Sequence, residues 1–348
     1  LKLITEREHE IELFNPEEFW TLGVQFSDIN KNSLVASLTQ LNNQKIEKFS
    51  FKDKAEINKA IDKVKSKKFQ INDISSKIVK RHASAPFTTS TLQQVSSGRL
   101  GFGASRTMQI AQKLYQGIEI DGETIGLITY IRTDGTNLST DAINTFREYI
   151  KSKFGAEYVP DSPASYSGKK AKNAQEAHEA IRPTDIMRAP NTVKKYLSPE
   201  QYKLYDLIWS RALSSQMKPA QFDRNTITIN SNDNKTICKA SGSVIKFDGF
   251  LKIMKDNKKD AEDILPEMKK GPANIEAILD EQHFTQPPPR YSEASLVKKL
   301  EELGIGRPST YASIISVIST RGYVEVTNKR FHPTDRGKLI SAFLEKLF

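Results

Sequence analysis

The hexapeptide Thr129-Tyr130-Ile131-Arg132-Thr133-Asp134 is the most informative stretch of this sequence. It follows the apolar run 125–128, which predicts a short buried strand. If the strand continues, successive side chains alternate between its faces, so Tyr130, Arg132 and Asp134 point the same way. A phenol, a guanidinium and a carboxylate would then share one face at the end of a strand. The sequence therefore predicts a functional site at this position.

A tyrosine beside an arginine is suited to attack on a phosphodiester. A free phenol has a pKa of ~10, and bringing it to neutrality requires roughly 4 kcal/mol of preferential stabilisation of the anion. One guanidinium about 4 Å away supplies an energy of that order at an effective dielectric of ~20. The same guanidinium can hold a phosphate oxygen in bidentate fashion, so the pair favours a phosphotyrosine link. The alternative is a structural tyrosine whose hydroxyl bonds Asp134 and whose ring packs.

Four blocks of the sequence carry a resemblance to a known family. Residues 126–134 surround the tyrosine, residues 86–94 followed by 100–103 precede it, and residues 175–183 and 304–312 follow it. In this order the blocks resemble type IA DNA topoisomerases. The apolar Ile131 between tyrosine and arginine is similar to bacterial topoisomerase I, because the topoisomerase III branch usually has proline there.

The resemblance implies roles for the matching residues. Tyr130 is the expected nucleophile, forming a 5′-phosphotyrosyl link, and Arg132 is its expected catalytic partner. His178 and Arg182 are four residues apart in a predicted helix and so share a face. The histidine that a zinc-protease motif needs is replaced by Arg182, so that motif is excluded. The predicted DNA-binding residues are Lys2, where the family usually has arginine, together with Arg7, Thr129, Asp134, His178, Arg182, Arg307, Ser309, Thr310 and Arg321.

The last of these residues surround one predicted helix. Arg307, Ser309 and Thr310 lie at its N-terminus, where backbone N–H groups and a guanidinium make an anion-binding site. Arg321 lies at its other end and either reaches the same DNA strand or complements the helix dipole. A helix at 292–303, this helix at 309–320 and a hairpin at 322–331 together predict a winged-helix-like unit. The alternative is a structural mini-domain that makes no DNA contact.

Composition narrows the class of protein. The 348 residues are 37% hydrophobic and 27% charged, enough for two or more folded domains. The formal net charge of +10 indicates an anionic partner, and nucleic acid is the first choice. The single cysteine, Cys238, excludes an intrachain disulfide and a multi-cysteine zinc site. No apolar run has the length of a membrane span, and we expect a cytoplasmic monomer.

The resemblance implies a multidomain α+β toroid, and hydrophobic patterning predicts its helices and strands. Helices are expected at 1–13, 52–68, 107–115 and 199–216, and strands at 22–26, 33–38, 74–81, 226–229, 235–240 and 277–279. The predicted domains are the first part of a base at 1–46, a β-rich arch at 47–88 and 218–288, an inserted helical domain with Tyr130 at 89–217, and the winged-helix-like remainder of the base at 289–348.

The resemblance also implies parts that this sequence does not match. The family carries its Mg²⁺-binding acids in a Toprim domain ahead of the equivalent of Leu1, and cysteine-rich zinc ribbons near its C-terminus. We therefore expect a fragment, inactive alone, of an enzyme that relaxes negatively supercoiled DNA without ATP. The acids at 260–263 are expected to be solvated. The alternatives are a non-catalytic single-strand-binding module, or the topoisomerase part of a reverse gyrase or of a topoisomerase III.

Overall fold

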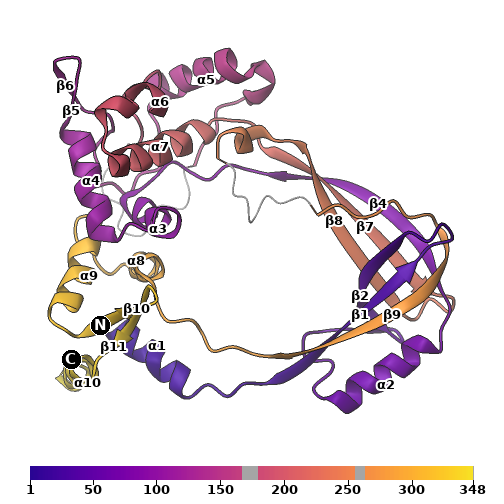
Figure 1. The fold of residues 1–348 in the computed structure, drawn as a ribbon. Helices are drawn as coiled ribbons and strands as arrows, with labels where there is room; N and C mark the ends of the chain where they lie inside the picture. The colour runs from indigo at the N-terminus through magenta and orange to yellow at the C-terminus, as the bar shows by residue number, and fades with distance from the viewer. Residues whose placement is uncertain (167–178, 255–262, 348) are drawn as a thin grey trace.

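The computed structural model describes residues 1–166, 179–254 and 263–347. These residues build three hydrophobic cores, which Figure 1 shows as three bodies placed around an opening. We call them the barrel (residues 18–81, 220–247 and 271–284), the helical region (residues 87–166 and 179–217) and the base (residues 1–13 and 290–347). The structure is thus a mixed α and β fold, as expected.

The barrel is a closed ring of antiparallel strands. Strand β1 (Glu18–Ser27) pairs with both β2 (Ser33–Leu41) and β9 (Gly271–Phe284), which joins the two ends of the sheet. The ladder runs from β9 through β4 (Phe69–Arg81), β7 (Ala220–Ser231) and β8 (Ile237–Phe247) to β2, and the short β3 (Gln44–Lys45) extends β2.

Alternation of side chains along each strand fills the barrel. In β2 the buried residues Leu34, Ala36 and Leu38 alternate with exposed ones, and Val24 and Phe26 of β1 are fully buried beside them. Helix α2 (Lys54–Lys65) packs on β1 and β9 through its apolar side. The six strands predicted at 22–26, 33–38, 74–81, 226–229, 235–240 and 277–279 each overlap a strand of this barrel, so these predictions are confirmed.

The predicted boundary at residue 46 is wrong in one respect. Residues 18–45 were grouped with the base, but β1, β2 and β3 belong to the barrel. The reason is pairing between distant parts of the chain, since β1 pairs along its whole length with β9. An alternating strand has the same pattern whichever sheet it joins, so the sequence did not distinguish the two. The other boundaries stay predictions.

The helical region is joined to the barrel by the three long strands β4, β7 and β8, which pair side by side and which Figure 1 shows running between the two bodies. Its core is formed around α7 (Pro199–Ser214), whose start carries a capping box on Ser198. The surrounding elements are α3 (Thr89–Arg99), α4 (Ala104–Gln116), β5 (Ile118–Ile120), β6 (Glu123–Ile125), α5 (Thr140–Phe154), α6 (Pro190–Val193) and the short 3₁₀ helices at 156–158, 194–196 and 249–252.

The base confirms the predicted order of helix, turn, helix and hairpin. Helices α8 (Glu293–Glu302) and α9 (Tyr311–Thr320) precede strands β10 (Val324–Thr327) and β11 (Arg330–Pro333), and α10 (Asp335–Leu347) follows. Helix α1 (Lys2–Glu12) packs against β11 and α10, so the two ends of the chain meet here. None of the helices in the described ranges is long and apolar enough to cross a membrane.

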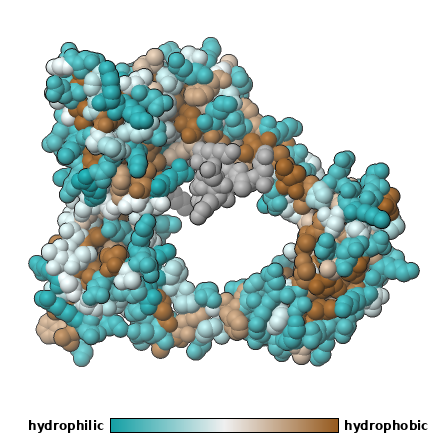
Figure 2. All heavy atoms as spheres, viewed as in Figure 1, coloured by the Kyte–Doolittle hydropathy of each residue, from teal (hydrophilic) through white to brown (hydrophobic). Residues whose placement is uncertain are grey.

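The three bodies enclose the opening completely in the view of Figure 2. The ring is completed where the helical region meets the base, because α3 packs on α8 and α4 packs on α9. At this seam the Glu293 carboxylate accepts a 2.6 Å hydrogen bond from the backbone N–H of Ala104, the first residue of α4. Gly103, the residue before it, has no side chain to cap the helix, so the base supplies the cap.

Candidate active site

The segment that bears Tyr130 is extended but is not a continuous strand. Strand β6 ends at Ile125, and beyond it Ile128 makes only an isolated bridge with Pro183. The predicted strand through the hexapeptide is therefore wrong. The predicted alternation is nevertheless present, because Ile131 and Thr133 are buried whereas Tyr130, Arg132 and Asp134 are exposed.

Hydrogen bonds from the start of α3 produce this alternation. The Thr89 hydroxyl donates to the Ile131 carbonyl at 2.7 Å, and the backbone N–H of Thr89 donates to the Thr133 carbonyl at 2.9 Å. In return, the N–H of Thr133 donates to the Thr89 hydroxyl oxygen at 2.8 Å. The backbone is thus held at every second residue, and the intervening side chains point outward. Thr88 fixes the helix itself through a capping box with Thr91.

The Tyr130 ring rests against a second tyrosine. Its centroid lies 5.6 Å from that of Tyr115 on the last turn of α4, in an edge-to-face arrangement. The two segments approach closely, since the N–H of Leu127 donates to the Leu114 carbonyl at 2.8 Å. A Cβ on Gly126 would lie 2.7 Å from the Tyr115 carbonyl oxygen, so this contact needs glycine. No hydrogen bond joins Tyr130 to Asp134 in the described structure, and Tyr130 is 47% exposed.

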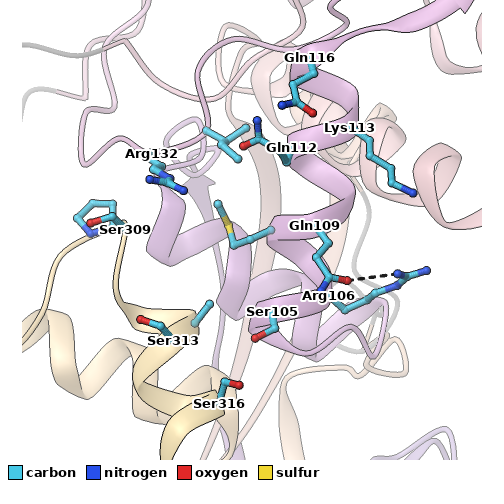
Figure 3. A pocket seen from close by; sticks show the side chains of 14 residues that line it. Ser105, Arg106, Gln109, Gln112, Lys113, Gln116, Arg132, Ser309, Ser313 and Ser316 are labelled. Atoms are coloured by element: carbon cyan, nitrogen blue, oxygen red, sulfur yellow. Dashed lines mark hydrogen bonds between the residues drawn. The ribbon is translucent and has the colours of Figure 1, made fainter.

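Arg132 and Asp134 face two different grooves at the seam. Arg132 lines a groove of about 620 Å³ between α4 and α9, where Figure 3 shows it beside Ser309. Asp134 lines a second groove of about 530 Å³ beside the turn between α8 and α9, which also contains Arg307. Pro308 borders both grooves. The structure therefore brings the tyrosine motif and the start of α9 together, although they are distant in sequence.

Glu301 is the second acidic group of the groove that Asp134 lines. The Ser90 hydroxyl at the start of α3 donates a 2.7 Å hydrogen bond to its carboxylate. Burial of this carboxylate, helped by the nearby charges of Glu302 and Asp134, raises the pKa of Glu301 above its usual range, although the Ser90 bond opposes the shift. This contact joins α3 to α8 across the seam.

Arg182 and Thr129 have partners within the protein. The Arg182 guanidinium forms a two-pronged ion pair with Glu179, at 2.7 and 3.0 Å, and its side chain is only 14% exposed. Burial opposes ionisation of Glu179, but Arg182 and the Ser139 N–H together hold its pKa below the usual range. The Thr129 hydroxyl donates to the Ala180 carbonyl and accepts from the Arg182 N–H. DNA contacts by Arg182 and Thr129 stay predictions from the resemblance.

The predicted helix across His178 and Arg182 is not confirmed. His178 lies outside the described residues. From Glu179 onward the chain is extended, with isolated bridges at Glu179, Ile181 and Pro183 to three separate segments. The period of three to four residues suggested a helix, but bonds to neighbouring segments replace the internal bonds of a helix here.

The remaining predicted DNA contacts are spread over the base. Lys2 is exposed and lies 3.7 Å from Glu6. Arg7 is engaged internally, because it bonds the Pro289 carbonyl and Glu10 and lies over the Tyr291 ring. The Thr310 hydroxyl closes the turn at Arg307, accepting from its N–H at 2.8 Å. Arg321 caps the far end of α9, about 15 Å along the helix from its start.

Comparison with known proteins identifies the family. The family model described as DNA topoisomerase matches residues 1–348. DNA topoisomerase 1 of Rickettsia felis is 49% identical over the whole chain, and that of Xylella fastidiosa is 46% identical over the whole chain. The chain belongs to the type IA family of bacterial DNA topoisomerase I. The resemblance read from the four sequence blocks is therefore confirmed.

The chain matches only part of these relatives. It spans 45% of the Rickettsia protein and 44% of the Xylella protein. Full-length topoisomerase I of Thermotoga maritima has a similar fold, with a TM-score of 0.80 and 35% identity over 99% of this chain and 54% of that one. The mixed α and β fold assigned to this part of the family is thus shared with a solved structure.

The family's expected Mg²⁺ can be tested against the side chains present. Within residues 1–166, 179–254 and 263–347, no group of three or more histidine, cysteine, aspartate or glutamate side chains is arranged to hold a metal ion. The described side chains therefore do not fit a magnesium site by themselves, and none of them is assigned as a ligand.

Several site residues were missed by the sequence interpretation. Tyr115 and the glutamines Gln109, Gln112 and Gln116 all lie on α4, which was read only as an amphipathic helix. The signal was present, because the glutamines recur at intervals of three and four and so share one exposed face. Glu301 and Ser90 gave no signal, since only the packing of α3 on α8 brings them together.

Replacing Glu301 by glutamine is expected to stabilise the protein at neutral pH. A raised pKa means that the fold favours the protonated carboxyl, so stability is lost as pH rises from the ordinary carboxyl pKa through the raised one. The introduced amide would keep an acceptor for Ser90 and carry no charge. The thermal midpoint of the variant should exceed that of the parent at pH 7, and the difference should shrink at pH 4. Glu302→Gln removes an exposed partner of Lys298 and only a minor cause of the raised Glu301 pKa, so its gain should be much smaller; an equal gain would contradict the assignment.

Proposed function

We propose that Tyr130 cleaves and reseals single-stranded DNA in a type IA topoisomerase that relaxes negative supercoils without ATP. The observation that carries the proposal is the exposed pair of Tyr130 and Arg132 on a backbone fixed by Thr89. The nucleophile and the phosphate-binding guanidinium project from the same side of one short segment. A strand bound across the seam would meet both.

The proposed reaction exchanges one phosphate ester for another. The Tyr130 oxygen attacks the phosphorus and loses its proton, a 5′-phosphotyrosyl bond forms, and the 3′ oxygen leaves and takes up a proton. Attack by the 3′ hydroxyl reverses the step and releases the tyrosine. Because ester is exchanged for ester, the bond energy is largely retained and no nucleotide is consumed. Arg132 would stabilise the charge on the phosphate in both directions.

The ring suggests how a second strand would pass. Tyr130 belongs to the helical region, whereas Arg307 and Ser309 belong to the base on the other side of the seam. Separation of α3 and α4 from α8 and α9 would open the ring beside the break. Mg²⁺, which the family resemblance implies, supports this chemistry when bound, and its ligands would have to come from outside the described residues.

Binding of single-stranded DNA by this 348-residue chain should depend strongly on salt. We expect the logarithm of affinity to fall with a slope of about −0.7 per neutralised phosphate. Arg307→Ala should weaken binding of all sequences alike and reduce the slope by about one such increment, because the proposed contact is to phosphate. Fluorescence anisotropy with labelled oligonucleotides, at salt concentrations from about 50 to about 300 mM, would measure this.

The matched control is Lys59→Ala, which removes one positive charge from α2 on the barrel. It should leave the affinity and the slope nearly unchanged. Equal affinity for single strands and blunt duplex, or the same loss in both variants, would contradict the proposed contact.

Tyr130→Phe should abolish relaxation while leaving strand binding within about 2-fold. The test uses a chimera in which this chain replaces the matching segment of the Rickettsia felis protein. The parent chimera should relax supercoiled plasmid with Mg²⁺ and no ATP. A variant that still relaxes plasmid would remove Tyr130 from the role of nucleophile, and a parent chimera that binds without relaxing would favour a binding module.

The 348-residue chain alone should bind single strands but leave plasmid supercoiled, with or without Mg²⁺. The reason is that its described residues contain no metal-binding group. Relaxation by the pure chain on a gel would show that acids within it complete the site.

Tyr115 should act as a positioning residue for Tyr130. An edge-to-face pair contributes about 0.5–1.5 kcal/mol, so in the chimera Tyr115→Leu should slow cleavage of a single-stranded oligonucleotide by about 2- to 10-fold. Tyr115→Phe keeps the ring and should restore the parent rate. If the Phe variant is as slow as the Leu variant, the hydroxyl rather than the ring matters and the packing role is contradicted.

A further inference from the structure

The groove between α4 and α9 has an apolar floor and a polar rim. Met108, Ile131 and Ala312 contribute apolar surface, and Gln112 and Ser313 stand at the rim (Figure 3). Its volume of about 620 Å³ lies in the range of small-molecule sites. A flat aromatic group with polar edges fits such a surface, because its faces contact the floor while its edges reach the rim.

Charge distinguishes this groove from its neighbour. Its lining includes Arg132 and Lys113 and contains no carboxylate, whereas the neighbouring groove contains Asp134, Glu301 and Glu302. A third cation of the lining, Arg106, is paired with Glu200 and so contributes less. The neighbouring groove also contains Arg307, so a DNA strand held at Arg132 would meet no carboxylate in the first groove and charges of both signs in the second.

The rim carries hydrogen-bonding groups without partners. The side chains of Gln112, Gln116, Ser309 and Ser316 form no hydrogen bond with another residue in the parts of the chain that the structure describes. The glutamines line one face of α4; Ser316 lies on the facing side of α9, and Ser309 lies in the turn just before α9 begins. A glutamine amide presents a donor and an acceptor side by side, the pattern that matches the N6 and N7 edge of adenine.

We propose that this groove binds the nucleobase next to the phosphate held by Arg132, with adenine preferred through Gln112. The base lies on Met108, Ile131 and Ala312, and its edge meets the Gln112 amide. The methionine thioether favours contact with an aromatic ring. This proposal rests on the proposed function, which places the scissile phosphate at Arg132. It adds a separate feature, which is a base preference beside the cleavage point.

The test measures binding of three ten-nucleotide strands to this 348-residue chain at one salt concentration: oligo-dA, oligo-dT and an abasic strand with the same phosphates. The parent should bind oligo-dA about 5-fold more tightly than oligo-dT and about 10-fold more tightly than the abasic strand, as contact with a base contributes. Gln112→Leu should bring the dA to dT ratio close to one while leaving the abasic affinity unchanged. An unchanged abasic affinity also shows that the variant folds.

Lys113→Gln on the next residue of α4 is the matched control. It removes a charge instead of the amide, so it should weaken binding of all three strands by the same factor and keep their ratios. Equal parent affinities for the three strands, or a dA to dT ratio that survives Gln112→Leu, would overturn the pocket. Salt-dependent binding without base preference would contradict the base-binding groove but leave the proposed strand binding intact. Absence of binding to any of the three strands would contradict both proposals.

Discussion

The hold of Thr89 on the backbone of Ile131 and Thr133 is the constraint on which the site depends. Those peptide groups are buried, and a buried peptide group needs a partner. If the segment were part of a sheet, a neighbouring strand would bond these peptide groups and would lie along one edge of the segment. Here the start of a capped helix supplies the bonds instead. The side chains of Tyr130 and Arg132 stay free for a ligand, while their backbone is as fixed as in a sheet.

The same helices hold the tyrosine and complete the ring. Helix α3 grips the Tyr130 segment and packs on α8, and α4 carries Tyr115 and packs on α9. Any separation at the seam would carry Tyr130 away from the base, so the proposed cleavage and the closure of the ring are linked. Hydrogen bonds of Ser90 with Glu301 and of Ala104 with Glu293 join the two sides of this seam. The opening proposed above would break these contacts.

Local pattern predicted most elements, but not how distant ones meet. The predicted helices and strands are present in the structure because their signals are local. Helix caps such as Ser198 and Ser292, and the alternation of buried and exposed residues, depend only on short segments. Closure of the barrel cannot be predicted from short segments, because it depends on pairing between residues as distant as Glu18 and Phe284. For the same reason Tyr130 and Arg132 could be chosen from sequence, whereas Tyr115 and Glu301 could not. The helix predicted at Arg182 is not formed. Residue spacing alone does not show whether a backbone group bonds within a helix or to a neighbouring segment.

Ion pairs and hydrogen bonds within the protein determine which arginines are available to bind DNA. Arg182 lies in a two-pronged pair with Glu179, and Arg7 is bonded to Glu10 and stacked on Tyr291. Taking either for DNA would leave a carboxylate unpaired, which costs free energy. Arg132 has no hydrogen bond or ion pair with any residue that the structure describes, so a phosphate would not have to displace an internal partner. Matching a family position therefore does not by itself make an arginine a DNA contact, and Arg132, unpaired among the described residues, is better placed than Arg7 or Arg182 for the proposed chemistry.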